Sequence, residues 1–316
     1  MHRSSILVTG AAGFIGSALV GALLARGYDV TAVDEDSLGL KRLASIDSGH
    51  LRIQRTDITN FADVADIMAR TNPAAVVHLA ALHVIPVCET QPRRTVDVNV
   101  TGLINVLQAA DTSSTERVIF ASSADVYAAS DKPLAESDPA RPSTVYGASK
   151  LLGERLVSEW GSPPERRTTS IRIFNVYGPG DRNPHVIPDV LRHIRQGVPI
   201  RVGNTEASRD FIYVDDVVDI LCRVLELDEP PSVLNAGTGS ATTVRQLLDL
   251  IQGLIGYSLP WMSDATKFRP NDRSYLQADT SMLRSILPEV DPRGLDAGLR
   301  HLLVADGVLL DGHPRA

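Results

Sequence analysis

Short apolar runs alternate with amphipathic stretches through the first 175 residues of the chain. The apolar, β-branched runs predict strands over 5–9, 29–34, 50–55, 75–79, 117–122 and 169–175. Stretches with helical periodicity predict helices over 13–26, 38–45, 62–71, 92–111 and 144–160. Repeated strand–helix units favour a parallel sheet with helices on both faces. We therefore expect an α/β fold built on a doubly wound parallel sheet.

The pattern changes after residue 175. Glycines and prolines interrupt it at Gly178, Pro179, Gly180, Pro184 and Pro188. Shorter helices are predicted over 188–196, 215–227 and 243–255, with a last sheet strand over 233–235, and the segment 258–279 is polar and loop-rich. We expect a cofactor-binding domain over 1–176 and 209–236, and a smaller C-terminal substrate-binding domain over 177–208 and 237–316.

Composition narrows the classes of function. With 316 residues, 43% of them hydrophobic and 22% charged, the chain can bury a full core. A formal net charge of −7 does not favour binding to the negatively charged phosphate backbone of a nucleic acid, so we expect no nucleic acid partner. The two cysteines, Cys88 and Cys222, lie far apart and lack metal-ligand spacing, so we expect neither a disulfide nor a metal site. No run approaches the ~18 apolar residues of a membrane span, and we expect a cytoplasmic protein.

A glycine-rich turn links the first predicted strand to the first helix. Gly10 allows a tight turn, Gly13 allows close approach of a pyrophosphate, and Gly16 allows the helix to pack closely on the strand. Phe14 and Ile15 open the helix, whose N-terminal N–H groups suit an anion. This context predicts a dinucleotide site, although a glycine triplet alone is also compatible with a plain strand–helix connection.

An acidic residue at the end of the second strand strengthens that prediction. Asp34 lies 24 residues after Gly10, where a carboxylate accepts hydrogen bonds from the adenosine ribose. Because Glu35 and Asp36 follow it, a 2′-phosphate would face three carboxylates. We therefore predict NAD rather than NADP.

Further cofactor contacts are predicted after the third and fourth strands. Asp57 with Ile58 suits an adenine amino group, although a loop or helix-capping role for the acid is equally compatible. Leu79, Ala80 and Ala81 offer small residues along which a dinucleotide can lie.

Tyr146 and Lys150 carry the predicted chemistry. They lie four residues apart at the start of a helix, which brings the ammonium near the phenol. A nearby positive charge favours phenolate and moves the pKa of the tyrosine, ordinarily about 10, toward neutral pH. The phenolate can then take a hydroxyl proton, and Ser123 at a strand end can donate a hydrogen bond to the same oxygen.

The motifs together resemble those of the extended short-chain dehydrogenases, the nucleotide-sugar epimerase/dehydratase family. The resemblance covers nearly the whole chain and rests on the turn 9–16 and on segments 78–81, 97–100, 122–123, 146–150, 172–179, 208–216 and 269–272. It implies a Rossmann-type domain, followed by a smaller domain that binds a nucleotide-diphosphate sugar. It also implies a homodimer formed through the helices 92–111 and 144–160.

Family roles carry over to matching positions only. The resemblance implies diphosphate contacts for Asn175, Arg209 and Arg269, and a nucleotide-ribose contact for Asp272. It places Ser122 and Asn99 in the cofactor site, with Asn99 supporting the lysine through water. His83 and Val186 are additional candidate substrate contacts, and a packing role for His83 remains open. An interface ion pair is the alternative for Arg209.

The resemblance implies transient oxidation of a sugar at C4. Ser123, Tyr146 and Lys150 suffice for a 4-epimerase, in which the 4-keto sugar rotates and the hydride returns to its other face. A 4,6-dehydratase carries an Asp–Glu pair where this chain has Ala124 and Asp125, so elimination is not expected.

Asp125 keeps other reactions open. An acid at this position occurs in UDP-glucuronate decarboxylases and could shuttle a proton, or it could simply bond to backbone or face solvent. We predict an NAD-dependent 4-epimerase, most simply for a UDP-sugar. A decarboxylase or other 4-keto-forming enzyme that uses Asp125 is the alternative, and a non-catalytic dinucleotide sensor is the third reading.

Overall fold

A computed structural model describes residues 4–46, 48–267 and 273–309. The chain forms two compact units, which are described separately. Unit 1 comprises residues 1–128, 139–173 and 218–234, and unit 2 comprises residues 129–138, 174–217 and 235–316.

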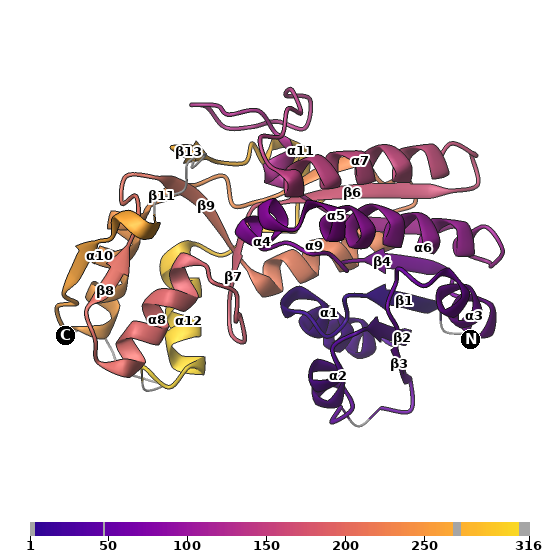
Figure 1. Cartoon of the computed structure of the whole chain (residues 1–316), viewed down its shortest axis with the longest axis horizontal. Helices are drawn as coiled ribbons and strands as arrows, with labels where there is room; N and C mark the ends of the chain where they lie inside the picture. Colours follow the sequence, from indigo (N-terminus) through magenta and orange to yellow (C-terminus); the bar gives the residue numbers. More distant parts are fainter. Residues whose placement is uncertain (1–3, 47, 268–272, 310–316) are drawn as a thin grey trace. The chain divides into compact units, whose positions relative to one another are not determined.

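Unit 1 is built on a seven-stranded sheet in the order β10-β6-β5-β4-β1-β2-β3 (Figure 1). The pairings β3–β2, β2–β1, β1–β4, β4–β5 and β5–β6 are parallel. The strands are β1 (Ser5–Thr9), β2 (Asp29–Asp34), β3 (Leu51–Arg55), β4 (Ala75–His78), β5 (Arg117–Ser123), β6 (Arg167–Ile173) and β10 (Val233–Ala236). The order 3-2-1-4-5-6 is that of dinucleotide-binding sheets, which bind ligands where the order reverses, here between β1 and β4. The predicted fold class is confirmed.

Helices cover both faces of this sheet. They are α1 (Phe14–Ala25), α2 (Ser37–Leu43), α3 (Phe61–Thr71), α4 (Ile85–Thr90), α5 (Pro92–Val96), α6 (Gly102–Ala110), α7 (Val145–Trp160) and the later part of α9 (Val214–Glu226). On one face α3, α6 and α7 pack against β1, β2, β4 and β5 around a core that includes Leu7, Met68, Leu103 and Phe120, while α1 lies on the other (Figure 1). Both faces are therefore buried, which explains why the strands read as continuous apolar runs.

The helix predicted over 92–111 is not regular. It consists of α5, a π-helical turn over Asp97–Thr101, and α6. The π-turn carries one residue more than an α-turn and contains Asn99, whose side chain is almost fully buried. Periodicity placed the helix correctly but could not locate this insertion.

The described residues of unit 2 form smaller sheets and several helices. Its strands are β7 (Asn175–Tyr177), β8 (Ile200–Val202), β9 (Ser208–Tyr213), β11 (Ala241–Thr243), β12 (Trp261–Ser263) and β13 (Tyr275–Leu276), and its helices are α8 (Val186–Gln196), α10 (Val244–Ile255), α11 (Ser281–Ile286) and α12 (Leu295–Ala305). The strand β9 pairs with β11, β13 and β7, and β8 pairs with β12. The segment predicted as loop-rich thus contributes two short strands among its described residues.

A buried carboxylate ties the segments of unit 2 together. Asp210 in β9 is fully buried and accepts hydrogen bonds from the N–H and hydroxyl of Thr238 (2.9 and 2.7 Å), from Gly239 N (2.9 Å) and from Ala278 N (3.1 Å). Burial raises the pKa of Asp210, while these hydrogen bonds act in the opposite direction. The acid therefore fixes two distant loops against the strand that carries Arg209.

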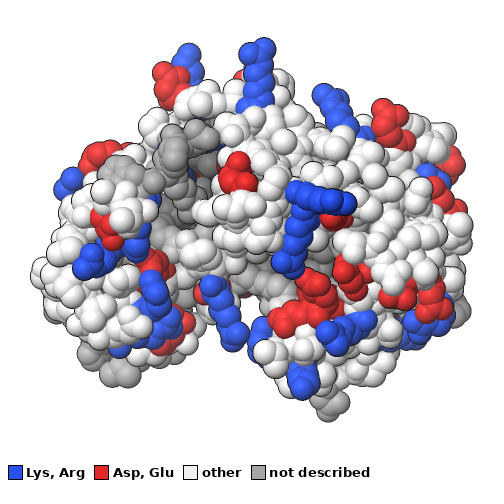
Figure 2. Space-filling view, in the orientation of Figure 1, with Lys and Arg blue, Asp and Glu red and all other residues white. Residues whose placement is uncertain are grey.

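The surface is mixed in charge. Figure 2 shows acidic and basic side chains interspersed on the face in view. Within the described ranges, the chain has no helix long and apolar enough to cross a bilayer.

Candidate active site and cofactor site

The glycine turn has the backbone geometry that its sequence predicts. Gly10 adopts φ +69°, and a Cβ there would lie 2.6 Å from Ala80 N. A Cβ on Gly16 would lie 2.1 Å from Gly10 O, so only glycine lets α1 begin this close to the turn. Gly13 is the N-cap of α1 and provides no side-chain cap. The N–H groups of the first turn, where Phe14 and Ile15 lie, are therefore available to an anion.

Asp34 braces this turn from the end of β2. Its Oδ2 accepts a hydrogen bond from Ala12 N and its Oδ1 one from Asp36 N, both at 2.9 Å. Each carboxylate oxygen can accept a second hydrogen bond, so the residue keeps capacity for ribose hydroxyls. Asp36 in turn caps α2 by accepting from Leu38 N.

The adenine side of the predicted site is built by the loop after β3. Asp57 Oδ1 accepts from both the N–H and the hydroxyl of Thr59, at 2.9 Å each, so this acid orders its own loop. Its contact with adenine stays a prediction. Ile58 is buried, and a Cβ on Gly102 would lie 2.5 Å from its Cδ1.

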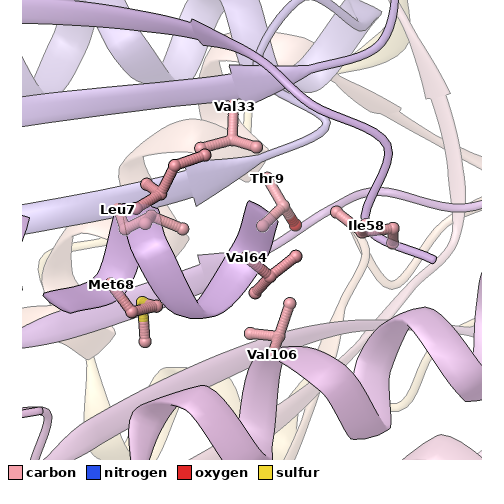
Figure 3. Close-up of a pocket in the computed structure, with 8 residues that line it drawn as sticks. Leu7, Thr9, Val33, Ile58, Val64, Met68 and Val106 are labelled. Atoms are coloured by element: carbon pink, nitrogen blue, oxygen red, sulfur yellow. The ribbon is translucent and has the colours of Figure 1, made fainter. Parts of the chain in front are cut away.

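Ile58 also lines a small gap in the core, shown in Figure 3. The gap measures about 10 Å³, and its other lining residues are Leu7, Thr9, Val33, Val64, Ile67, Met68 and Val106. It is at the lower limit for one water molecule and its walls are almost entirely apolar. We therefore interpret it as imperfect packing and not as a ligand site.

The chain after β4 is held by side-chain hydrogen bonds. Leu79 N donates to Thr9 O (3.1 Å) and Ala80 N approaches Thr9 Oγ1 (3.4 Å). Asn99 in the π-turn accepts from Leu82 N (2.7 Å) and donates to Leu82 O and to Ser149 Oγ, both at 2.9 Å. Asn99 thus orders the backbone beyond Ala81 and joins it to α7.

The helix α7 starts with two caps. Thr144 Oγ1 accepts from Gly147 N (2.9 Å), and the Glu89 carboxylate from α4 accepts from Val145 N (2.7 Å). These bonds fix the first turn, which carries Tyr146. One turn later, Lys150 donates from Nζ to Ala121 O (2.7 Å) and lies 5.9 Å from the centroid of the Tyr146 ring.

The structure corrects the expected direction of the Tyr146 pKa. Burial raises the pKa of this tyrosine, the charge of Asp125 raises it further, and hydrogen bonding with the Ser123 side chain lowers it. Burial also lowers the pKa of Lys150 to about 7, against smaller opposing effects of Cys88 and Glu154. The four-residue spacing brings Tyr146 and Lys150 together as predicted. In the protein without a cofactor, however, the effect of desolvation on both pKa values outweighs the attraction between phenolate and ammonium. Phenolate formation therefore needs positive charge beyond that of the lysine.

Ser123 and Asp125 lie beside the first turn of α7. Ser123 ends β5, and its Oγ accepts from Asp125 N at 3.1 Å, which caps the 3₁₀ turn Ala124–Val126. A Cβ on Gly147 would lie 2.5 Å from Asp125 O, so this turn abuts α7 directly. The backbone of Asp125 therefore lies beside the residue that follows Tyr146, and the charge of Asp125 raises the Tyr146 pKa.

Ser122 has a different partner from the one expected. Its side chain is almost fully buried, and its hydroxyl donates to Glu154 Oε1 at 2.5 Å. Glu154 also binds Arg172 through two hydrogen bonds of 2.9 and 2.8 Å. Sequence reasoning missed Glu154, although its position one turn after Lys150 on the same helix was a usable signal.

The predicted substrate residues belong to both units. In unit 1, His83 is exposed between β4 and α4. In unit 2, Asn175 begins β7 and its Oδ1 is buried without a hydrogen-bond partner, which leaves capacity for a ligand donor. Arg209 lies in β9, where it donates to Ser208 O at 2.8 Å, and Val186 is the first residue of α8.

Two predicted residues, Arg269 and Asp272, lie outside the described residues. Unit 2 also contains a polar cavity of about 190 Å³ next to the loop after β7. It is lined by Gly178, Gly180, Asp181, Arg182, Ile187, Pro188, Leu191, Arg195, Leu302 and Asp306. Among the described residues, no cluster of His, Cys, Asp or Glu side chains could hold a metal ion.

The fold and the Tyr–Lys site define a dinucleotide-binding α/β enzyme. Residues 6–237 match the NAD dependent epimerase/dehydratase family, and the chain belongs to this family. The predicted cofactor, NAD, and the predicted family are thereby confirmed.

Known relatives and solved structures agree. A UDP-glucose 4-epimerase from Mycolicibacterium smegmatis is 31% identical over 293 residues, which cover 89% of this chain and 91% of that protein. A dTDP-4-dehydro-6-deoxyglucose reductase from Escherichia coli is 28% identical over 281 residues, 84% of this chain and 88% of that protein. The structure of MoeE5 in complex with UDP-glucuronic acid and NAD is similar, with a TM-score of 0.86 and 34% identity, over 96% of this chain and 98% of the other. The relatives thus include both epimerases and reductases of nucleotide sugars.

Proposed function

We propose that this chain is an NAD-dependent UDP-sugar 4-epimerase that works through a transient 4-keto sugar. The observation that carries the proposal is the meeting of Tyr146, Lys150 and Ser123 beside α7, in the same unit as the glycine turn. The similarity to a UDP-glucose 4-epimerase and to MoeE5 with a bound UDP-sugar supports the choice of substrate class.

In this mechanism Tyr146 takes the proton of the C4 hydroxyl while Ser123 donates a hydrogen bond to the same oxygen. NAD held at the glycine turn (Gly10, Gly13 and Gly16) would supply the acceptor and donor of the C4 hydride and the positive charge that phenolate formation needs. Lys150, with a pKa of about 7, is poised to hold its proton beside the phenolate or to release it near neutral pH. Rotation of the keto sugar presents its other face, to which the hydride returns at C4 while Tyr146 returns the proton to the oxygen, so the 4-epimer forms without net oxidation.

The decisive experiment is a substrate panel. The protein is incubated with UDP-, dTDP-, GDP- and CDP-sugars, including UDP-glucose and UDP-glucuronic acid, and the products are identified by NMR. We expect interconversion of a UDP-sugar with its 4-epimer in the wild type and none in Tyr146→Phe. Formation of a 4-keto-6-deoxy sugar, or reduction of a supplied keto sugar only, would replace the epimerase proposal by another activity of the family.

A decarboxylase is the second candidate, because the Asp125 backbone abuts Gly147 next to Tyr146 and the charge of Asp125 acts on the Tyr146 phenol. An acid at this point can shuttle a proton to a carbanion formed after C4 oxidation and loss of CO₂. Release of CO₂ from UDP-glucuronic acid by the wild type, abolished in Asp125→Asn, would establish this reaction. Unchanged epimerisation in Asp125→Asn means that the acid has no catalytic part.

We further propose that Arg209 holds the diphosphate, because a guanidinium forms paired hydrogen bonds with phosphate oxygens. Arg209→Met should weaken UDP binding severalfold in calorimetry, by loss of one charged contact. The matched control is Arg284→Met, which removes an exposed arginine from α11 of the same unit. Equal affinities for all three proteins would exclude Arg209 from the site.

Finally, we propose a homodimer formed through α5 and α7. Val96 in α5 and Leu152 in α7 are large apolar residues with 46% and 47% exposure. The double variant Val96→Glu, Leu152→Glu should run as a monomer in light scattering, while the wild type runs as a dimer. A monomeric wild type contradicts this proposal.

A further inference from the structure

Three residues of α7, spaced four apart, meet three consecutive residues at the end of β5. Lys150 donates to Ala121 O, Glu154 accepts from the Ser122 hydroxyl, and Tyr146 shares a hydrogen bond with the Ser123 side chain. Such spacing places the three helical side chains along one stripe of α7. The first two residues of the stripe belong to the Tyr–Lys site, whereas Glu154 touches no group of the proposed reaction.

Glu154 is instead one half of a buried ion pair. Its side chain and that of Arg172 are each only 6% exposed, and the guanidinium binds both carboxylate oxygens. Arg172 lies directly opposite Ser122 in the β5–β6 register. A pair of this kind crosslinks α7 to two strands at once, and it is costly to break because a lone buried charge remains.

Arg172 also reaches the far end of the same segment. Its guanidinium carbon lies 4.6 Å from the centroid of the Tyr127 ring, which is fully buried. Segment 122–127 is therefore held at its start by Glu154 and at its end by Arg172. Between these two anchors lie Ser123 and Asp125, the two groups of the segment proposed to face the substrate.

We propose that the Glu154–Arg172 pair is a positioning clamp that fixes segment 122–127 against α7 and so sets Ser123 relative to Tyr146 and Lys150. The importance of Ser123 rests on the proposed epimerase function. The clamp itself is made by residues of the chain alone, so its effect on the Tyr–Lys pair can be measured in the NAD complex without any sugar.

Glu154 has an electrostatic effect that a purely structural residue would lack. Its charge favours the ammonium form of Lys150, one turn away. The other titratable groups around the lysine are Tyr146 on α7, Cys88 on α4 and His78 on β4. Neutralising Glu154 makes the lysine lose its proton at lower pH, so the proton at neutral pH resides more often on the phenol, which cannot then act as a base.

The first test is a titration of the NAD complex, followed by the near-ultraviolet absorption of tyrosinate. The tyrosine signal is assigned as the part that is lost in Tyr146→Phe. In Glu154→Gln less tyrosinate should be present at neutral pH, and the apparent pKa for tyrosinate formation should move to higher pH by about half a pH unit or more. Glu159→Gln, the same change at an exposed position of α7, is the matched control and should leave the titration unchanged.

The second test measures turnover of the UDP-sugar identified by the substrate panel. Glu154→Gln should lower kcat about tenfold or more, with KM and NAD affinity within about threefold of wild type, because only the alignment of reacting groups changes. Ser122→Ala removes one hydrogen bond and leaves the Glu154–Arg172 ion pair intact. This variant therefore still tests the clamp if Glu154→Gln fails to fold. It should lower kcat by a factor of about 3 to 10. Arg172→Lys keeps the positive charge but loses the forked geometry of the guanidinium, so its kcat should also lie below that of the wild type.

The outcomes separate the two proposals. A titration that shifts as expected, in a protein that converts no nucleotide sugar, leaves the clamp standing and refutes the epimerase function. Normal turnover of the wild type, with kcat and titration unchanged in both Glu154→Gln and Ser122→Ala, refutes the clamp alone. A loss of activity that is explained entirely by weaker NAD binding also refutes it.

Discussion

Replacing Lys150 with methionine should make the protein inactive and more stable. Lys150 is 2% exposed, and burial lowers its pKa from 10.5 to about 7. The folded chain therefore keeps this group charged at neutral pH only at a cost, which the unfolded chain does not bear. Methionine has a similar length and no charge, so Lys150→Met removes that cost.

The size of the effect follows from the pKa difference. The gap between 10.5 and about 7, at about 1.36 kcal/mol per pH unit, corresponds to roughly 4 kcal/mol at pH 7. The variant loses the Nζ hydrogen bond to Ala121 O, worth about 1–3 kcal/mol, and the contact of the ammonium with the Phe120 ring, worth about 1 kcal/mol. We expect a net stabilisation of up to about 2 kcal/mol.

The pH dependence of stability tests independently whether Lys150→Met stabilises the protein. Between pH 7 and 10.5 the unfolded chain holds more protons at this group than the folded chain, so the stability of the wild type rises with pH. The advantage of Lys150→Met should therefore shrink from pH 7 to pH 9. Urea denaturation at several pH values measures this. A Trp261→Phe background leaves Trp160, buried in α7 of unit 1, as the single tryptophan reporter.

Lys41→Met is the control, since Lys41 is exposed on α2 of the same unit. Its effect on stability should stay within about 0.5 kcal/mol. A variant at position 150 that is less stable than wild type, or whose advantage is independent of pH, would refute the view that desolvation dominates at this lysine.

Three further predictions follow from buried groups and from the cofactor turn. Asp210→Ala should cost unit 2 about 3–5 kcal/mol in urea denaturation followed by Trp261 fluorescence, because three backbone N–H groups lose their acceptor; a cost below 1 kcal/mol would contradict the inferred role. Burial holds the pKa of His78 at about 3, so its contribution to the free energy of unfolding is fully present above about pH 6.5 and should fall toward pH 4 by about 1.36 kcal/mol per pH unit. His78→Asn should flatten this pH dependence. An equal slope in wild type and variant would contradict the role of His78. Asp34→Asn should weaken NAD binding about tenfold in calorimetry and reduce the ratio of NAD affinity to NADP affinity. An unchanged ratio would show that Asp34 does not select the cofactor.

Local patterns account for most of what could be predicted. Apolar runs and helical periodicity located the strands and helices of unit 1, because both faces of its sheet are buried. The glycine turn was predictable because Gly10 has a positive φ and Gly16 leaves no space for a side chain, and both requirements are local. The spacing of Tyr146 and Lys150 likewise fixes their neighbourhood through the geometry of one helix.

Features that depend on the surroundings could not be predicted. The pKa of Tyr146 depends on how deeply α7 is buried, and helical spacing does not report burial. The partner of Glu154 is Arg172, 18 positions later on another element, and only the register of β5 and β6 brings them together. The π-turn at Asn99 was missed because one inserted residue shifts the periodicity without ending the helix.

The π-turn lets this helix lose one residue without changing the direction in which its ends face. A π-turn completes one rotation with one residue more than an α-turn, so the helical segments on either side of it keep their orientation. Deleting one residue of Asp97–Thr101 should therefore convert it to an ordinary α-turn, while Asn105 in α6 keeps its hydrogen bonds to the carbonyls of Ile58 and Thr59, at 2.9 and 3.0 Å. The cost would fall on the turn itself, because Asn99 would lose its place against Leu82 and Ser149. Homologous chains with one residue fewer between Pro92 and Ala110 should accordingly lack the π-turn and hold the backbone at Leu82 in another way.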